Sequence, residues 1–434
     1  MNKEKKFLLA GAVAALLLGG CGDRQENEGK ALYEESLELG ASAADNAAAA
    51  RAEELLQRAA ELNYAPAIFH RGRGMLRSPD ADVQKSGFEM LQRAAGAGHA
   101  EAAYHLGLCY DRGVGTDRNP VLAVRCWQQA AAARWADAMV VLGMAHANGY
   151  GGLERDMGKA VEYYTAAAEA GNPAGAYSMA VCHDRGAGVR KDAAKALDYA
   201  TQAAGQKHAE ACLFVARAYM EGYGGAPQDC ARAIPYLKVA VKAGNEVALL
   251  ELGKLLFDGH GVKQDYPGAV RCFEQAAARG NAEAFCLLGA CFDRGLGVAI
   301  NPAKAAVCWK KAAAAGHPRA ACFLGKCVAS GHGATRDLQQ AAKLFAFSAQ
   351  QGDVLGAMEY AACLMKGLGV PKDCAAAVEI YRKYAETGNP SAMFHLGNCL
   401  ESGAGIKADP EAARDWWRKA AAAGHMQATE KLAP

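Results

Sequence analysis

The sequence is short of several features that would assign it a function at once. Its 434 residues include only 13 prolines, and 48 basic residues are balanced by 46 acidic ones, for a net charge of +2. A balanced charge gives no electrostatic footprint for nucleic acid or for an anionic membrane surface as the main partner. Because 52% of the residues are hydrophobic and proline is scarce, the chain is neither collagen-like nor an ordinary disordered protein.

Motifs for catalysis and metal binding are missing as well. The sequence has no Cys-x-x-Cys, so redox sites and ribbon-type zinc sites lack their signature. No serine is followed three positions later by lysine, as serine β-lactam enzymes require. Gly-x-Ser-x-Gly and His-Glu-x-x-His are also absent. We therefore expect no catalytic residue, no metal site and no cofactor.

The first residues have the pattern of an export signal. Lys3, Lys5 and Lys6 precede an apolar run over 7–18, which is too short to cross a bilayer as a helix. The run ends in the sequence Leu-Gly-Gly followed by Cys21, which resembles a bacterial lipobox. This resemblance implies that residues 1–20 are a signal peptide and that Cys21 carries acyl chains such as palmitate. Two or three acyl chains would anchor the protein stably in a bacterial envelope membrane.

The residues after the lipobox suggest which membrane holds the anchor. Gly22 stands where an aspartate favours retention in the inner membrane of some bacteria, so the lipobox resemblance favours the outer membrane, facing the periplasm. Residues 21–46 are polar and then alanine-rich, and we predict that they form a tether containing one short helix over Lys30–Leu39.

The glycines that the chain has in excess, 49 in all, are periodic. A small residue, here called the marker, recurs every 35 to 37 residues, at Gly72, Gly107, Gly143, Ala180, Ala216, Gly253, Gly289, Gly325, Ala361 and Gly397. In nine of the ten units a Gly-x-Gly begins six residues after the marker. A large ring is expected about twenty residues after it, at Trp127, Tyr163, Tyr236, Phe273, Trp309, Phe345, Tyr381 and Trp417. The chain is therefore a repeat array.

Each unit is predicted to form two helices. In one unit the pattern predicts a helix over Ala282–Arg294 and a second over Pro302–Ala315, with Asn301 at the cap position before the second. The loop glycines Gly295 and Gly297 lie where a helix end favours positive φ. Because the marker residue is glycine or alanine, its small side chain lets the two helices approach closely, and the ring fills the space beside it. Stacked helix pairs of this kind form a superhelix with a concave face.

This unit resembles a Sel1-like repeat, a relative of the tetratricopeptide repeat. The resemblance rests on Leu288-Gly289, on the Gly-x-Gly-Val that begins at Gly295, on Lys304-Ala305 and on Trp309. It implies an all-α, α/α superhelical solenoid of about ten helix hairpins over residues 47–434, which scaffolds protein assemblies without a shared catalytic residue. The unit at Gly72 departs from the pattern, as a capping unit does.

A cysteine-rich branch of the same family offers an alternative function. That branch has been linked to β-lactam binding, so a cell-wall-active or β-lactam-binding enzyme is the competing hypothesis. The missing Ser-x-x-Lys argues against it, and so does the absence of the Cys-x7-Cys pattern with which that branch joins successive units.

Fourteen cysteines follow Cys21, and many occupy fixed positions in the repeat. Six lie two residues after the marker, where cysteine can serve as a small buried hydrophobe: Cys109, Cys182, Cys291, Cys327, Cys363 and Cys399. Cys126, Cys272 and Cys308 form a second column, nineteen residues after the marker. The pairs Cys109–Cys126 and Cys291–Cys308 are candidate disulfides within a hairpin, which an oxidising envelope would permit. Four histidines, His99, His208, His317 and His425, share a turn position and are expected to lie too far apart to bind one metal.

Charged columns give the candidate binding residues. If the first helix of each unit faces inward, as in tetratricopeptide repeats, three positions line the groove. The position six before the marker holds Glu101, Asp137, Glu210 and Glu283, and the position after it holds Arg73, Arg217, Lys254 and Lys326. The position five after it holds Arg112, Asn148, Arg185, Arg294 and Lys366. Such a mixed polar groove suits a protein partner, an envelope or host protein, better than lipid; the alternative is a solvated face without a partner.

Overall fold

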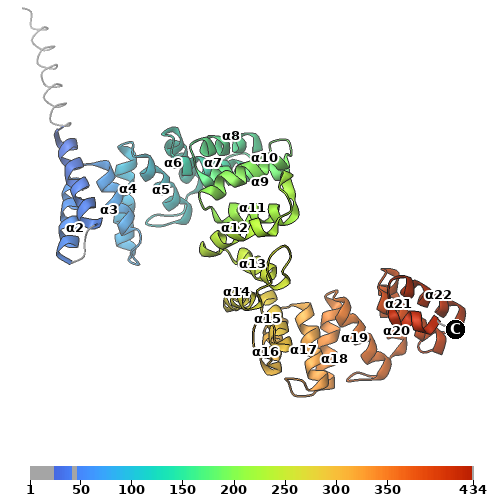
Figure 1. The fold of residues 1–434 in the computed structure, drawn as a ribbon. Coiled ribbons are helices and arrows are strands. Elements are labelled where there is room, and N and C mark those ends of the chain that lie inside the picture. Colours follow the sequence, from blue (N-terminus) through green and yellow to red (C-terminus); the bar gives the residue numbers. More distant parts are fainter. Residues whose placement is uncertain (1–23, 42–45, 433–434) are drawn as a thin grey trace, which may run out of the picture. The chain divides into compact units, whose positions relative to one another are not determined.

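The computed structural model describes residues 24–41 and 46–432, and within these ranges the ordered elements are all helical (Figure 1). The all-α helical-repeat architecture is therefore confirmed. The predicted signal peptide and Cys21 lie outside the described residues. None of the described helices is long and apolar enough to span a membrane.

The chain divides into two compact units, residues 1–228 and 229–434. After a helix over 24–41, the first unit contains α2 (Asn46–Glu61), α3 (Ala65–Met75), α4 (Ala81–Gly96), α5 (Ala100–Arg112), α6 (Pro120–Ala132), α7 (Ala136–Asn148), α8 (Met157–Glu169), α9 (Pro173–Arg185), α10 (Ala193–Gly205), α11 (Ala209–Glu221) and the 3-10 helix η1 (Tyr223–Gly225). The second unit contains α12 (Cys230–Lys242), α13 (Glu246–Asp258), α14 (Tyr266–Ala278), α15 (Ala282–Arg294), α16 (Pro302–Ala314), α17 (Pro318–Ser330), α18 (Leu338–Gln350), α19 (Val354–Lys366), α20 (Cys374–Glu386), α21 (Pro390–Ser402), α22 (Pro410–Ala422) and α23 (Met426–Leu432).

The helix ends lie where the capping residues predict them. The side chain of Asn301 accepts a hydrogen bond from the backbone N–H of Lys304, and Pro302 occupies the first turn of α16. Gly295 ends α15 with a φ of 72°, a left-handed conformation that favours glycine. Within each unit, successive helices pack side by side, and some first helices of adjacent repeats, such as α7 and α9, also contact each other.

The marker positions let the two helices of a hairpin touch. A Cβ added at Gly289 would lie 2.3 Å from Nε1 of Trp309, which is closer than real Cβ atoms approach. The ring column is confirmed in this hairpin, but it is wrong by one residue in the two repeats that are 37 residues long. There the buried side chains are Tyr164 and Leu237 rather than Tyr163 and Tyr236. Each of these loops carries one additional glycine, which shifts the second helix by one position.

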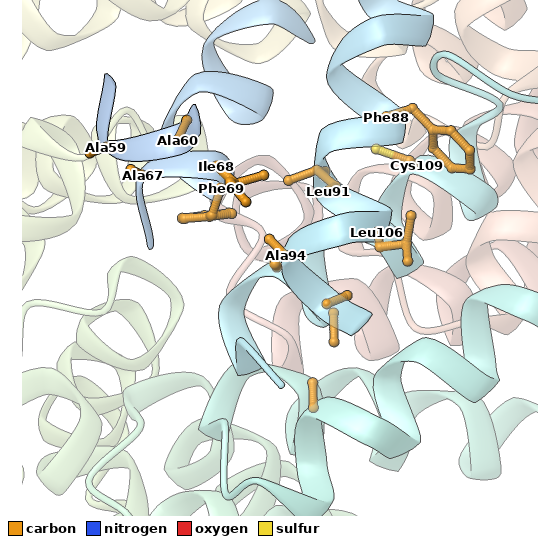
Figure 2. Packing of buried hydrophobic residues seen from close by; sticks show 14 of the residues in the cluster. Ala59, Ala60, Ala67, Ile68, Phe69, Phe88, Leu91, Ala94, Leu106 and Cys109 are labelled. Atoms are coloured by element: carbon orange, nitrogen blue, oxygen red, sulfur yellow. The ribbon is translucent and has the colours of Figure 1, made fainter. Parts of the chain in front are cut away.

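The segment predicted as a tether is ordered over 24–41 and joins the core, so the tether prediction is wrong for these residues. Its Tyr33 lies with its ring centroid 5.6 Å from that of Tyr64, and Ser36 is buried. The predicted short helix is thus part of a longer one. Its Leu32 and Tyr33 pack against the cluster that contains Phe69 and Leu91. Figure 2 shows this cluster, which the end of a repeat stack would otherwise expose to water.

Candidate protein-binding site

The acidic candidate residues are engaged unequally, because some of them pair with a base of the preceding repeat. Nη1 of Arg73 lies 3.4 Å from Oε1 of Glu101, and Nζ of Lys254 lies 2.5 Å from Oε1 of Glu283. In both pairs the base directly follows the marker of one repeat, and the acid precedes the marker of the next by six residues. We call these contacts the inter-repeat ion pairs. Glu101 and Glu283 are therefore already paired with bases of the chain itself.

Three other candidates lie apart from these pairs. Asp137 accepts a hydrogen bond of 2.7 Å from the side-chain amide of Asn172. Arg112 and Arg294 are exposed in the last turns of α5 and α15, where a cation interacts favourably with the helix dipole. Among the residues described, neither arginine has an ion pair. They are separate exposed positions.

The structure brings two of the candidates, Arg185 and Glu210, into one cleft. This cleft has a volume of about 340 Å³ and lies between α9 and α11. Its lining includes Tyr177, Val181 and Phe214, together with Tyr223 from η1. Charged residues make up nearly half of the lining, namely Asp184, Arg185, Glu210, Arg217 and Glu221. We call this the α9–α11 cleft.

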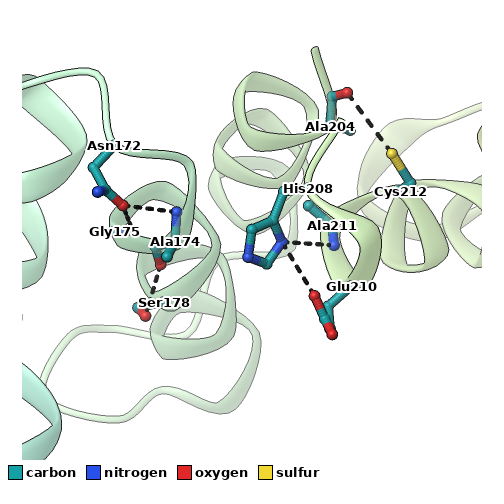
Figure 3. Close-up of polar contacts among 9 residues, drawn as sticks. All are labelled: Asn172, Ala174, Gly175, Ser178, Ala204, His208, Glu210, Ala211 and Cys212. Carbon is teal, nitrogen blue, oxygen red and sulfur yellow. Dashed lines mark hydrogen bonds and ion pairs between the residues drawn. The ribbon is translucent and has the colours of Figure 1, made fainter. Parts of the chain in front are cut away.

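Glu210 lines the cleft at the first turn of α11, and His208 lies beside it (Figure 3). Nδ1 of His208 accepts a hydrogen bond of 3.3 Å from the backbone N–H of Ala211, and so caps α11. The same nitrogen lies 3.5 Å from Oε2 of Glu210, and the imidazole packs against Tyr177 with ring centroids 5.0 Å apart. Burial lowers the pKa of His208 in spite of the carboxylate of Glu210, which raises it. The imidazole is therefore neutral near pH 7 and supplies no cation to Glu210.

The cleft is also lined by a tyrosine that the sequence analysis did not single out. The hydroxyl of Tyr223 donates a hydrogen bond of 2.5 Å to Oδ1 of Asp184 in the preceding repeat. Two repeats before this contact, the hydroxyl of Tyr150 donates the equivalent hydrogen bond to Asp111. Burial and the bond to Asp184 raise the pKa of Tyr223 to about 12. A tyrosine at the middle of Gly-x-Gly in both repeats is the signal that could have identified this contact.

The four histidines at the turn position act as helix caps. In each of them Nδ1 accepts a hydrogen bond from a backbone N–H three residues later, as found for His99, His208, His317 and His425. Asn and Asp side chains do the same in several other repeats, for example Asn245 and Asp353. The prediction that these histidines are turn residues is confirmed. In the described part of the chain no group of three or more histidine, cysteine, aspartate or glutamate residues could hold a metal ion.

The fourteen cysteines that follow Cys21 are all free thiols in the structure. The two predicted disulfides, Cys109–Cys126 and Cys291–Cys308, are therefore not formed. Burial raises the pKa of Cys109 and of Cys291 to about 11, and the neighbouring thiol of each pair adds to the rise. All six cysteines two residues after the marker are buried, so this column serves as small core residues.

Comparison with known proteins agrees with the repeat architecture. The Sel1 repeat model matches residues 47–64, 59–99, 100–134, 136–172, 173–208, 209–245, 247–281, 282–317, 318–353, 354–389 and 390–425. The chain belongs to the Sel1 repeat family. Sel1 repeat proteins in general mediate protein–protein interaction, and the family is generally non-catalytic.

Two solved structures resemble this Sel1 repeat protein along much of its length. One is a protective antigen of uropathogenic Escherichia coli that displays an SLR fold, with a TM-score of 0.80 and 25% identity over 93% of this chain and 86% of that one. The other is a Sel1 repeat protein from Oxalobacter formigenes, with a TM-score of 0.51 and 25% identity over 57% of this chain and 99% of that one.

A third relative matches a shorter stretch of the chain. Chitin synthase regulatory factor 3 of Schizosaccharomyces pombe is 30% identical over 122 residues, which are 27% of this chain. The match spans 13% of the yeast protein.

Proposed function

We propose that this Sel1 repeat protein is a lipid-anchored scaffold of the bacterial envelope, which binds a protein partner on the face formed by the first helices of its repeats. The α9–α11 cleft carries this proposal. It lies between two such helices and joins Arg185 and Glu210, two residues from the charged columns expected to line the groove. The partner is an envelope protein or, if the scaffold reaches the cell surface, a host protein. The similar E. coli protein is described as a protective antigen, which supports an exported scaffold.

The anchoring part of the proposal rests on the lipobox and has its own test. We expect Cys21→Ser to move the protein from the membrane to the soluble fraction, because the acyl chains would supply the membrane affinity. Cys126→Ser, which changes a half-buried cysteine in α6, is the matched control and should stay with the membrane. Membrane retention of the Cys21→Ser variant would contradict the lipid anchor. Separation of the two membranes by density would test the outer-membrane assignment.

The binding part of the proposal is tested by chemical cross-linking in intact cells, followed by purification of the scaffold. We expect Glu210→Arg to reduce the captured partner, because it reverses a charge in the α9–α11 cleft. Arg112→Glu and Arg294→Glu test the two exposed positions outside the cleft. Arg271→Glu changes an exposed arginine on α14, a second helix, and serves as the control. Partner capture that is the same in all four variants would refute binding on the first-helix face.

A further inference from the structure

The α9–α11 cleft shares most of its plan with the packing between α3 and α5. One difference is Phe214, which stands where α5 has His105, an imidazole whose Nε2 lies 3.8 Å from Oε1 of Glu101. Between α3 and α5, the guanidinium of Arg73 lies 6.0 Å from the ring centroid of Phe69 and pairs with Glu101. His99 caps α5 and stacks on the same ring, with centroids 5.0 Å apart. This arrangement places one cation between an aromatic face and a carboxylate.

Each of these residues has a counterpart in the α9–α11 cleft. Tyr177 stands at the position of Phe69, His208 at that of His99, and Glu210 at that of Glu101. His208 again caps its helix and packs on the aromatic ring, with centroids 5.0 Å apart. The position of Arg73, however, is occupied by Val181. The carboxylate and the aromatic ring are therefore in place, but the cation that joins them between α3 and α5 is missing.

The carboxylate of Glu210 is more accessible than that of Glu101. The side chain of Glu210 is 57% exposed, against 28% for Glu101 in the complete arrangement. The titratable group within 4 Å of this carboxylate is His208. Nδ1 of its neutral imidazole accepts the capping hydrogen bond and has no proton to donate to Glu210. Val181 cannot pair with Glu210, because its side chain carries no charge and no donor.

We propose that the α9–α11 cleft receives an arginine or lysine side chain from an extended segment of the protein partner, which takes the place that Arg73 holds between α3 and α5. The guest cation would lie over Tyr177 and pair with Glu210, combining a cation–π contact with a charge-assisted hydrogen bond. This inference names the chemistry of the partner and rests on the proposed function for the identity of the binding face.

The remaining charges in the cleft are compatible with such a guest. Arg185 lies one helical turn beyond Val181, about 6 Å further along α9. It is thus displaced from the position of Val181, and the lining beside it includes the carboxylates of Asp184 and Glu221. Arg217 also lines the cleft. Burial raises the pKa of Tyr177, and the charges of Arg185 and Arg217 lower it, so both cations act on this ring. The three carboxylates of the lining outnumber these two guanidinium groups, which favours a basic guest.

The test measures binding of capped, fluorescein-labelled peptides to the full-length protein in detergent, by fluorescence anisotropy at low salt. Four peptides share the frame Gly-Ser-Gly-X-Gly-Ser-Gly, with arginine, lysine, citrulline or glutamate at X. Citrulline has nearly the shape of arginine but no charge. We expect the arginine peptide to bind at least about tenfold more tightly than the citrulline peptide, because hydrogen bonds to charged groups are the stronger ones. Binding should weaken as salt is added.

Variants locate the binding at the cleft. Glu210→Gln should weaken the arginine peptide about three- to tenfold, since a half-exposed ion pair is partly screened. Val181→Arg should abolish binding, because it supplies from the chain the cation that the guest would bring. Glu101→Gln, which breaks the Arg73 pair instead, should bind as the unchanged protein does. Val181→Leu adds bulk without charge and should weaken binding much less than Val181→Arg does. Circular dichroism checks that each variant is folded.

Several outcomes would overturn the inference. These are no binding of the arginine peptide up to about 10 mM, equal binding of the citrulline or glutamate peptide, or unchanged binding in a folded Val181→Arg variant. The proposed function fails separately, in the fractionation and cross-linking experiments. A cleft that binds arginine peptides in a protein without an envelope partner would support the cleft chemistry and refute the scaffold role.

Discussion

Replacing Gly289 by alanine tests the idea that the marker positions set the distance between the helices of a hairpin. In the present structure Trp309 is 4% exposed, and its Nε1 donates a hydrogen bond of 3.1 Å to the backbone carbonyl of Cys286. An alanine Cβ would lie 2.3 Å from this Nε1 and 2.5 Å from Cδ1 of the same ring. Because the contact is with a rigid indole, the ring or the helix must move.

The expected cost is the balance of three contributions. Overpacking a well-filled core costs about 1–3 kcal/mol. Displacing the indole puts at risk a buried hydrogen bond whose loss costs about 1–3 kcal/mol. Alanine is favoured over glycine within a helix by about 1 kcal/mol, which acts in the opposite direction. We therefore expect a net local destabilisation of about 2 kcal/mol for the Gly289→Ala variant.

Amide hydrogen exchange is the suitable measurement, because a repeat array does not have to unfold in one step. A loss of about 2 kcal/mol should raise the exchange rate of the protected amides in α15 and α16 about thirtyfold. Gly74→Ala is the matched control: Gly74 also lies in a helix, but an added Cβ would meet no atom within 4 Å. This control should slow exchange in α3. Equal behaviour of the two variants would refute the close-approach argument.

Two further predictions concern groups whose pKa is shifted by burial. Burial in the folded state lowers the pKa of His208, so below about pH 6.5 the unfolded chain binds a proton more readily than the folded chain does. The free energy of unfolding therefore falls as the pH drops toward the lowered folded pKa. His208→Asn keeps a cap like that of Asn245 and should flatten the pH dependence of the urea midpoint between pH 7.5 and 5. An unchanged slope would contradict this role for the cap. Burial also raises the pKa of Cys322 to about 12, so alkylation of its thiol at pH 8 should be very slow in the native protein and fast after unfolding; rapid native labelling would show that α17 is less well packed than described.

The hairpin architecture could be predicted almost completely, because its signals are local. The helix boundaries at α15 and α16 follow from Asn301, Pro302 and Gly295, each of which acts on the few residues beside it. The tether prediction missed that the acidic segment over 24–41 packs on the repeats, because its partners lie far along the chain. The helix over 24–41 is held by contacts such as that between Tyr33 and Tyr64, which lie 31 positions apart in the sequence.

The candidate site was predictable in part. The repeat phase correctly placed Arg185 and Glu210 among residues that could share a face, but it could not tell them from Glu101 and Glu283. That distinction depends on which residue of the preceding repeat lies opposite each carboxylate. The offset between stacked helices decides it, and a one-dimensional pattern does not contain that offset. The same limitation explains why two thiol columns with suitable spacing suggested disulfides that the structure does not contain.

By itself, the sequence determined the family, the all-α hairpin array and the capping of its helices, because glycine, proline and cap residues act through the backbone of their own turn. Only the tertiary structure decided which charges neutralise one another between repeats, which rings lie against the markers, and which carboxylates and aromatic rings share a cleft. The charge pairs join residues about 30 positions apart in sequence, which the packing of one repeat on the next brings together. A marker and its ring, such as Gly289 and Trp309, lie 20 positions apart and meet through the packing of two helices in one hairpin.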